Sequence, residues 1–190
     1  MTENTQEQEF MDANSKIDVG LLNNHIHFLT GEIGEYNIEK AIKWIIYENT
    51  KPEEGKQLTL YINSGGGSVT DSLALIDIMR SSPIPIRTVG IGSICSAAFM
   101  IFACGEKGQR IISKNTSIMC HQYSGGFYGK HHDIKAYVKE AELTSDRLVK
   151  ILEEVTEMKP EKIVQTLLPP TDVWLTPDEL IKYGVADIIQ

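Results

Sequence analysis

The sequence predicts an α/β fold built from right-handed βαβ crossovers. Short aliphatic and β-branched runs alternate along the 190 residues with longer segments of helical periodicity, the pattern of such folds. One strand-like run, 58–62, leads through a glycine-rich turn at 63–67 directly into a helical pattern. Another, 86–91, precedes a nearly continuous apolar stretch that opens on Ser96, and a helix that is apolar on every side must be buried.

The other central elements follow from periodicity and from helix-ending signals. Apolar residues fall on one side of a helix over 37–48, as an amphipathic helix requires. The next helix, over 69–81, ends shortly before Pro83, because the residue before a proline disfavours helical backbone. The expected strands are 25–29, 58–62, 86–91, 111–122 and 185–189.

A long helix is expected at 133–158, and we name it the handle helix. Its apolar or small residues are spaced alternately by four and three positions, at Ile134, Val138, Ala141, Ser145, Leu148, Leu152 and Val155. Such a heptad seam requires a partner, which is either the protein's own core or another subunit. A last helix begins with the capping box of Thr176 and Glu179.

Composition excludes several classes of protein. The formal net charge is −8 and no basic stripe occurs, so a nucleic-acid partner is not expected. The three cysteines lie in apolar runs without C-x-x-C spacing, which predicts buried thiols in a reducing, cytoplasmic setting. Residues 1–16 predict a flexible acidic segment without signal-peptide features, and 17–190 predict a single domain. No charge-free apolar run is long enough to span a membrane.

Ser96 is the first candidate for chemistry. It stands where a strand-like run passes into the buried helix, and unpaired N–H groups at a helix start favour developing negative charge. A serine there suits an acyl-transfer nucleophile with its oxyanion. It also suits a simple helix cap, because serine is common at that position.

His121 is the best candidate for a general base. It comes directly after the strand-like run 117–119 and Cys120. An imidazole at the end of a strand can face a cleft. The alternative is a histidine satisfied within the core. The pair His131 and His132 lies in a polar segment, and a zinc site lacks further ligands at suitable spacing, so no metal is expected.

The glycine run 65–67 does not form a phosphate-binding motif, because it lacks both the G-K-[ST] and the G-x-G-x-x-G patterns. Its amides are unobstructed by side chains, so Gly67 and Ala97 together could bind an oxyanion. Asp172 follows a proline break and precedes an apolar strand. It is either an ordinary turn aspartate or the acid that orients the histidine.

Several motifs resemble the proteolytic subunit family of Clp protease (ClpP). They are Tyr61-Ile62-Asn63-Ser64 before glycines, the Gly92-x-x-x-Ser96 elbow, Met119-Cys120-His121-Gln122 with Gly125-Gly126 behind it, and Tyr183-Gly184-Val185-Ala186-Asp187. The segment 21–31 is similar to the family's first strand, so the resemblance covers 17–190.

The resemblance implies a ClpP/crotonase-type fold of stacked βαβ units with a protruding handle helix. It implies that Ser96 is the nucleophile, His121 the general base and Asp172 the orienting acid. Gly67 and Ala97 would supply the oxyanion amides. The substrate would lie as an added strand between the loop near Ser68 and the segment 124–129, which includes Gly125 and Gly126. No cofactor is implied for the subunit.

The resemblance also implies heptameric rings, a closed chamber, and unfolded polypeptides delivered by an AAA+ ATPase unfoldase. Thr171 and Val173 stand where the family typically has arginines that couple the site to ring contact. The resemblance therefore does not decide between one ring and two stacked rings. The alternatives are a maturation protease acting on one assembly partner without an ATPase, a non-catalytic ring subunit, and an acyl-CoA binder of the crotonase type.

Overall fold

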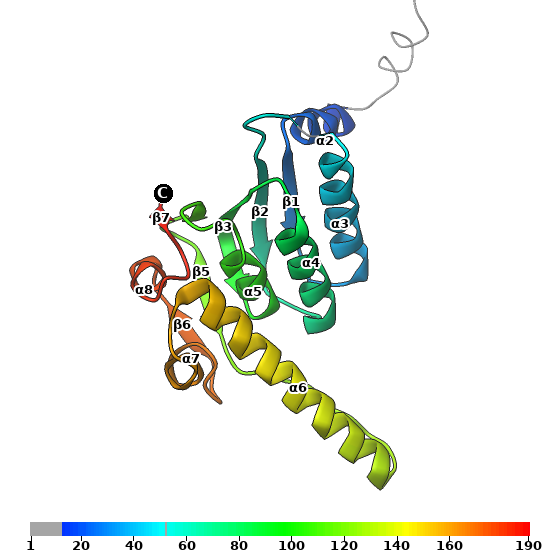
Figure 1. The fold of residues 1–190 in the computed structure, drawn as a ribbon, viewed down its shortest axis with the longest axis vertical. Helices are drawn as coiled ribbons and strands as arrows, with labels where there is room; N and C mark the ends of the chain where they lie inside the picture. The colour runs from blue at the N-terminus through cyan, green and yellow to red at the C-terminus, as the bar shows by residue number, and fades with distance from the viewer. Residues whose placement is uncertain (1–12, 52) are drawn as a thin grey trace, which may run out of the picture.

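The computed structural model describes residues 13–51 and 53–190. Parallel strands form most of a seven-stranded sheet with the order β1-β2-β3-β4-β7, and β5 joins β3 to β6. Helices α3, α4 and α5 lie along one face of β1, β2 and β3 (Figure 1). The strands are β1 Ile26–Thr30, β2 Leu58–Ser64, β3 Ile86–Cys95, β4 Arg110–Ile112, β5 Ser117–Cys120, β6 Val173–Leu175 and β7 Ile188–Ile189. The predicted mixed α/β fold is therefore confirmed, and it is consistent with the ClpP/crotonase type.

The helices match the predicted ones closely, with two additions, α2 and α7. They are α2 Ala13–Asn23, α3 Glu35–Asn49, α4 Val69–Ser81, α5 Ala97–Ala103, α6 His131–Thr156, α7 Pro160–Thr166 and α8 Pro177–Lys182. Helix α8 has the expected capping box. Helix α7 was not anticipated, because its seven residues are too few to show a clear helical period.

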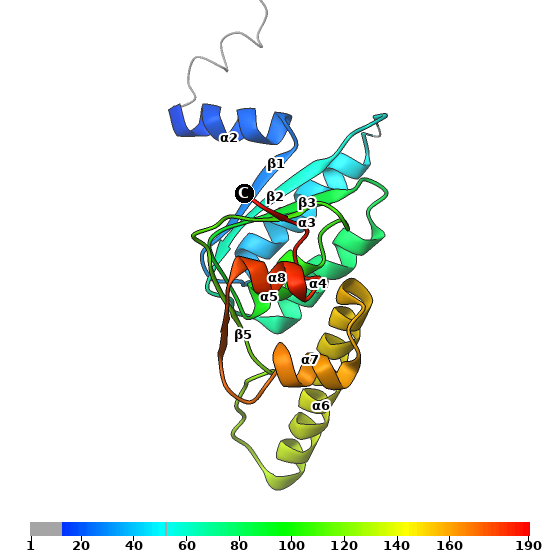
Figure 2. The same cartoon turned by 90° about the vertical axis from the view of Figure 1, so that its left-hand side faces the viewer.

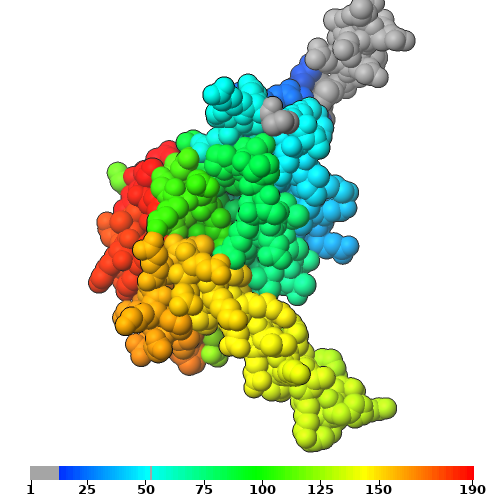
Figure 3. Space-filling model, in the orientation of Figure 1, coloured from blue at the N-terminus to red at the C-terminus, as the bar shows by residue number. Residues whose placement is uncertain are grey.

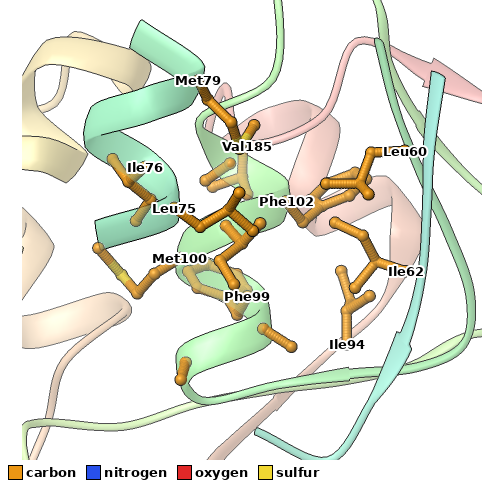
Figure 4. Close-up of a cluster of buried hydrophobic side chains, with 14 of the residues drawn as sticks. Leu60, Ile62, Leu75, Ile76, Met79, Ile94, Phe99, Met100, Phe102 and Val185 are labelled. Atoms are coloured by element: carbon orange, nitrogen blue, oxygen red, sulfur yellow. The ribbon is translucent and has the colours of Figure 1, made fainter. Parts of the chain in front are cut away.

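The core lies between β2, α4 and α5. Figure 4 shows Leu60 and Ile62 of β2 facing Leu75 of α4 and Phe99 and Phe102 of α5. All seven residues of α5 are buried, which confirms the expectation from its apolar sequence. This packing fixes the start of α5, where the candidate nucleophile lies.

Strand β3 changes neighbours along its length, and this change shapes the site. Its first half pairs with β4 at Thr88–Gly90, and its second half pairs with β5 at Ser93–Cys95. The expected strand at 111–122 is therefore two strands separated by a turn. The change brings the end of β5 beside the end of β3.

The handle helix is α6, and its two halves differ. In the C-terminal half Leu148 and Leu152 are buried against the core. In the N-terminal half Ile134 and Val138 are 41 % and 48 % exposed, and that half projects from the body of the molecule (Figures 2 and 3). The seam packs on the protein's own core over only part of its length.

The structure describes only part of the N-terminal segment that we expected to be flexible. Residues 13–16, expected to be flexible, form the first turn of α2. The rest of the expected segment, 1–12, lies outside the described residues. None of the 11 residues of α2 is buried. Within 13–51 and 53–190, no helix is long and apolar enough to cross a bilayer.

Candidate active site

Ser96 lies at the sharp junction between β3 and α5. Its φ of 54° and ψ of −119° lie outside the regions that L residues favour, and such a conformation costs about 1–3 kcal/mol. The conformation is held on both sides, because Ser96 N donates to Met119 O at 2.9 Å and Met100 N donates to Ser96 O at 3.3 Å. The side chain makes no capping hydrogen bond to α5. The hydroxyl is therefore held in place but is not used as a helix cap.

His121 is the side-chain partner of the Ser96 hydroxyl. Its Nε2 lies 2.9 Å from Ser96 Oγ, which is within hydrogen-bond distance for a nucleophile and its base. The pairing of Cys95 with Met119 in the parallel β3 and β5 brings the residue after β5 beside the junction at Ser96. Donation from the serine hydroxyl to Nε2 requires the tautomer in which Nδ1 carries the proton.

Asp172 lies one residue before β6 and is not bonded to His121. The antiparallel pairing of β5 with β6 ends at Cys120 and Val173, and His121 and Asp172 are the next residues on the two segments. Asp172 is exposed. Within the described part of the chain it makes no hydrogen bond and no ion pair. The structure thus brings serine and histidine into contact and leaves Asp172 outside that pair.

The glycine loop packs directly on the serine. A Cβ on Gly66 would lie 2.8 Å from Ser96 Cβ and 2.7 Å from the carbonyl oxygen of Cys95. The loop is fixed from its other side, because Ile33 N donates to Gly66 O and Ser68 N donates to Ile33 O, both at 2.8 Å. Gly66 and Gly67 have φ values of 99° and 148°, which only glycine adopts readily. The loop therefore requires glycine for both space and backbone conformation.

The two candidate oxyanion amides are unoccupied by internal partners. Among the described residues, neither Gly67 N nor Ala97 N donates a hydrogen bond. Both residues line one cleft together with Ser96 and His121. Two free donors beside a hydroxyl are what a developing oxyanion needs.

The same cleft has a largely apolar wall. Val69, Phe99, Met100, Leu148 and Leu168 line it, and they come from α4, α5, α6 and the segment after α7. The chemistry at one end of the cleft is polar, and the wall beyond it is apolar. Sequence reasoning missed Leu148 and Leu168 as lining residues, because nothing in their local pattern places them at a cleft.

The remaining candidates lie around this cleft. Ser68 caps α4 and accepts from Asp71 N at 3.2 Å. Gly125 and Gly126 are exposed in the chain between β5 and α6. From this part of the chain, the cleft lining includes residues 120–124 but neither glycine. Gly66 was not singled out from the sequence, although its place in a three-glycine run was an available signal.

Two of the three cysteines, Cys104 and Cys120, do not compete as nucleophiles. Burial raises the pKa of Cys104 to about 11 and the pKa of Cys120 to about 12, so both thiols stay protonated near neutral pH, and the thiolate is the reactive form. Over the described ranges, no three His, Cys, Asp or Glu side chains are grouped to hold a metal ion.

The family model described as Clp protease matches residues 5–190. The match spans the strands, the junction at Ser96, and the segments that carry His121 and Asp172.

Proposed function

The chain belongs to the Clp protease family, and from this premise we propose that it is a serine endopeptidase. Ser96 is the nucleophile, His121 the general base and Asp172 the acid that orients the histidine. The observation that carries the proposal is the 2.9 Å contact of Ser96 Oγ with His121 Nε2, made by a serine in a strained backbone conformation. Strain of this kind persists at sites where function requires it.

The reaction proceeds through an acyl-enzyme. His121 takes the hydroxyl proton as Ser96 Oγ attacks the scissile carbonyl carbon, and the amides of Gly67 and Ala97 bind the resulting oxyanion. The imidazolium then protonates the leaving amine, and the C–N bond breaks. A water molecule, deprotonated by His121, hydrolyses the ester and restores the serine. No cofactor takes part.

The substrate is an unfolded polypeptide bound mainly through its backbone. We place it as an added strand between the loop at Ser68 and the segment 124–129, where Gly125 and Gly126 let another backbone approach. The apolar wall of the cleft accepts one side chain. Because backbone bonds dominate, sequence specificity is low.

Assembly into heptameric rings, one or two stacked, supplies the partner for the handle helix. The exposed apolar side chains in its N-terminal half support this placement, because an unpaired heptad seam is stabilised by another subunit. We assign delivery of substrates to an AAA+ unfoldase and place the protein in the cytoplasm.

Hydrolysis of a short fluorogenic peptide by Ser96→Ala tests the function. The variant should lose activity by about 10⁴-fold or more, since removal of the nucleophile leaves only binding and oxyanion contacts. Ser93→Ala, three positions earlier on the same strand, should retain it. Equal turnover by the parent protein and Ser96→Ala would refute the proposal.

Casein degradation with and without an added unfoldase separates the general protease from a maturation protease. Degradation that requires the unfoldase and ATP supports the proposal. Cleavage of a single assembly partner without ATP would instead identify a maturation protease.

A further inference from the structure

An aromatic cluster joins the chain after His121 to the handle helix. Tyr123 lines the cleft together with Ser96 and His121. Its hydroxyl group lies close to that of Tyr137, in the second turn of α6, because both hydroxyls approach the same point beside Gly125. The ring of Phe127 stacks on Tyr137 with centroids 5.2 Å apart and planes inclined by 19°. The cluster therefore connects the cleft to a helix that otherwise projects from the body.

The backbone at Gly125 packs under this hydroxyl pair. A Cβ on Gly125 would lie 2.3 Å from the Tyr137 hydroxyl oxygen and 2.9 Å from the Tyr123 hydroxyl oxygen. The φ of Gly125 is not in the left-handed region, so the need for glycine here is one of space. Gly126 has no neighbour within 4 Å of its Cβ position. The close approach is specific to Gly125.

Nothing else in the backbone fixes this stretch. In the described part of the chain, residues 123–129 make no backbone hydrogen bonds. Their N–H and C=O groups are free to pair with an added strand, while their position depends on side-chain contacts with α6. A free edge that is already held in place binds an extended peptide at a lower entropic cost.

We propose that Tyr123 and Tyr137 are positioning residues, whose hydroxyl pair holds the segment 124–129 on the handle helix in the form that receives the substrate backbone. This rests on the proposed peptidase function and adds residues to its substrate site. The hydroxyls do not touch the reacting atoms. Their effect is on the binding of extended peptides and not on the serine–histidine pair.

Limited chymotrypsin digestion tests the holding role without the protein's own activity. In a Ser96→Ala background, Tyr123→Phe and Tyr137→Phe each remove one hydroxyl and keep the ring. Cleavage within 124–130 should accelerate about three- to tenfold in each, the scale of one neutral hydrogen bond. The double variant should be no faster than either single variant, because both remove the same contact between the two hydroxyls. The control is Tyr47→Phe, since that side chain lies on α3, outside the segment, and is 54 % exposed, and it should not change the rate.

Kinetics with Ser96 intact separate positioning from a merely structural role. For an extended peptide, KM should rise by about three- to tenfold in Tyr123→Phe and Tyr137→Phe with kcat nearly unchanged. Hydrolysis of a small activated ester, which cannot pair with the segment, should not change.

Unchanged digestion in both variants, additive effects in the double variant, or equal changes for peptide and ester would overturn the proposal. If the parent protein hydrolyses neither substrate, the peptidase function fails. The digestion rates then still decide whether the hydroxyl pair holds the segment.

Discussion

His121 has two flanks, one toward Ser96 and one toward Asp172, and the subunit forms a hydrogen bond only on the first. Toward Ser96, a 2.9 Å contact joins the imidazole to a residue held between β3 and the fully buried α5. Toward Asp172, the carboxylate is exposed and lies just before the three-residue strand β6. The difference indicates that sheet register and core packing suffice to form the serine–histidine pair. They do not by themselves bring the aspartate into a hydrogen bond with the histidine.

The largest effect should come from removing His121, which lies between both flanks. His121→Ala should lower kcat for peptide hydrolysis by about 10⁴- to 10⁶-fold, because the serine then lacks its base. His132→Ala is the matched control, since that side chain is 77 % exposed and lies at the start of α6. Steady-state kinetics measure both variants, and a loss below tenfold in His121→Ala would remove the histidine from the mechanism.

A smaller loss is expected from Asp172→Asn, and it should depend on assembly. In the assembled protein, kcat should fall by up to about 10⁴-fold, because an amide no longer favours the required histidine tautomer. In isolated subunits the substitution should leave serine labelling by a phosphonate unchanged, since Asp172 makes no bond there. Gel filtration separates the two states. An equal loss in both would contradict the comparison between the flanks.

Gly66→Ala tests how tightly the serine flank is built. The new methyl group would meet Ser96 and the carbonyl of Cys95 at a φ of 99°, so we expect a loss of roughly 1–3 kcal/mol in unfolding free energy. Activity should fall as the junction shifts. Gly65→Ala, with nothing within 4 Å of its Cβ position, should change neither. Denaturant melts measure the pair, and equal stability of the two variants would show that the loop does not constrain Ser96.

The sequence was most informative where local rules decide the structure. Helix α4 has the predicted bounds and α8 the predicted capping box, because caps and apolar periodicity act over a few residues. The expected strand at 111–122 was wrong in its continuity, because only the change of partner along β3 reveals the break. The short α7 left too weak a pattern to be predicted.

The candidate site, too, could be predicted from the sequence only in part. The strand-to-helix junction made Ser96 a candidate, and a histidine at a strand end made His121 one. Their 2.9 Å contact depends on the register of β3 with β5, which no local pattern specifies. Tyr123 and Tyr137 are 14 positions apart in the chain, and only the path of α6 brings them together.

Mass spectrometry of the protein after treatment with a fluorophosphonate tests the central claim most directly. We predict one adduct, located on Ser96, which is absent in His121→Ala although that variant remains folded. No adduct on the parent protein in any assembly state, or an adduct on a different serine, would contradict the account.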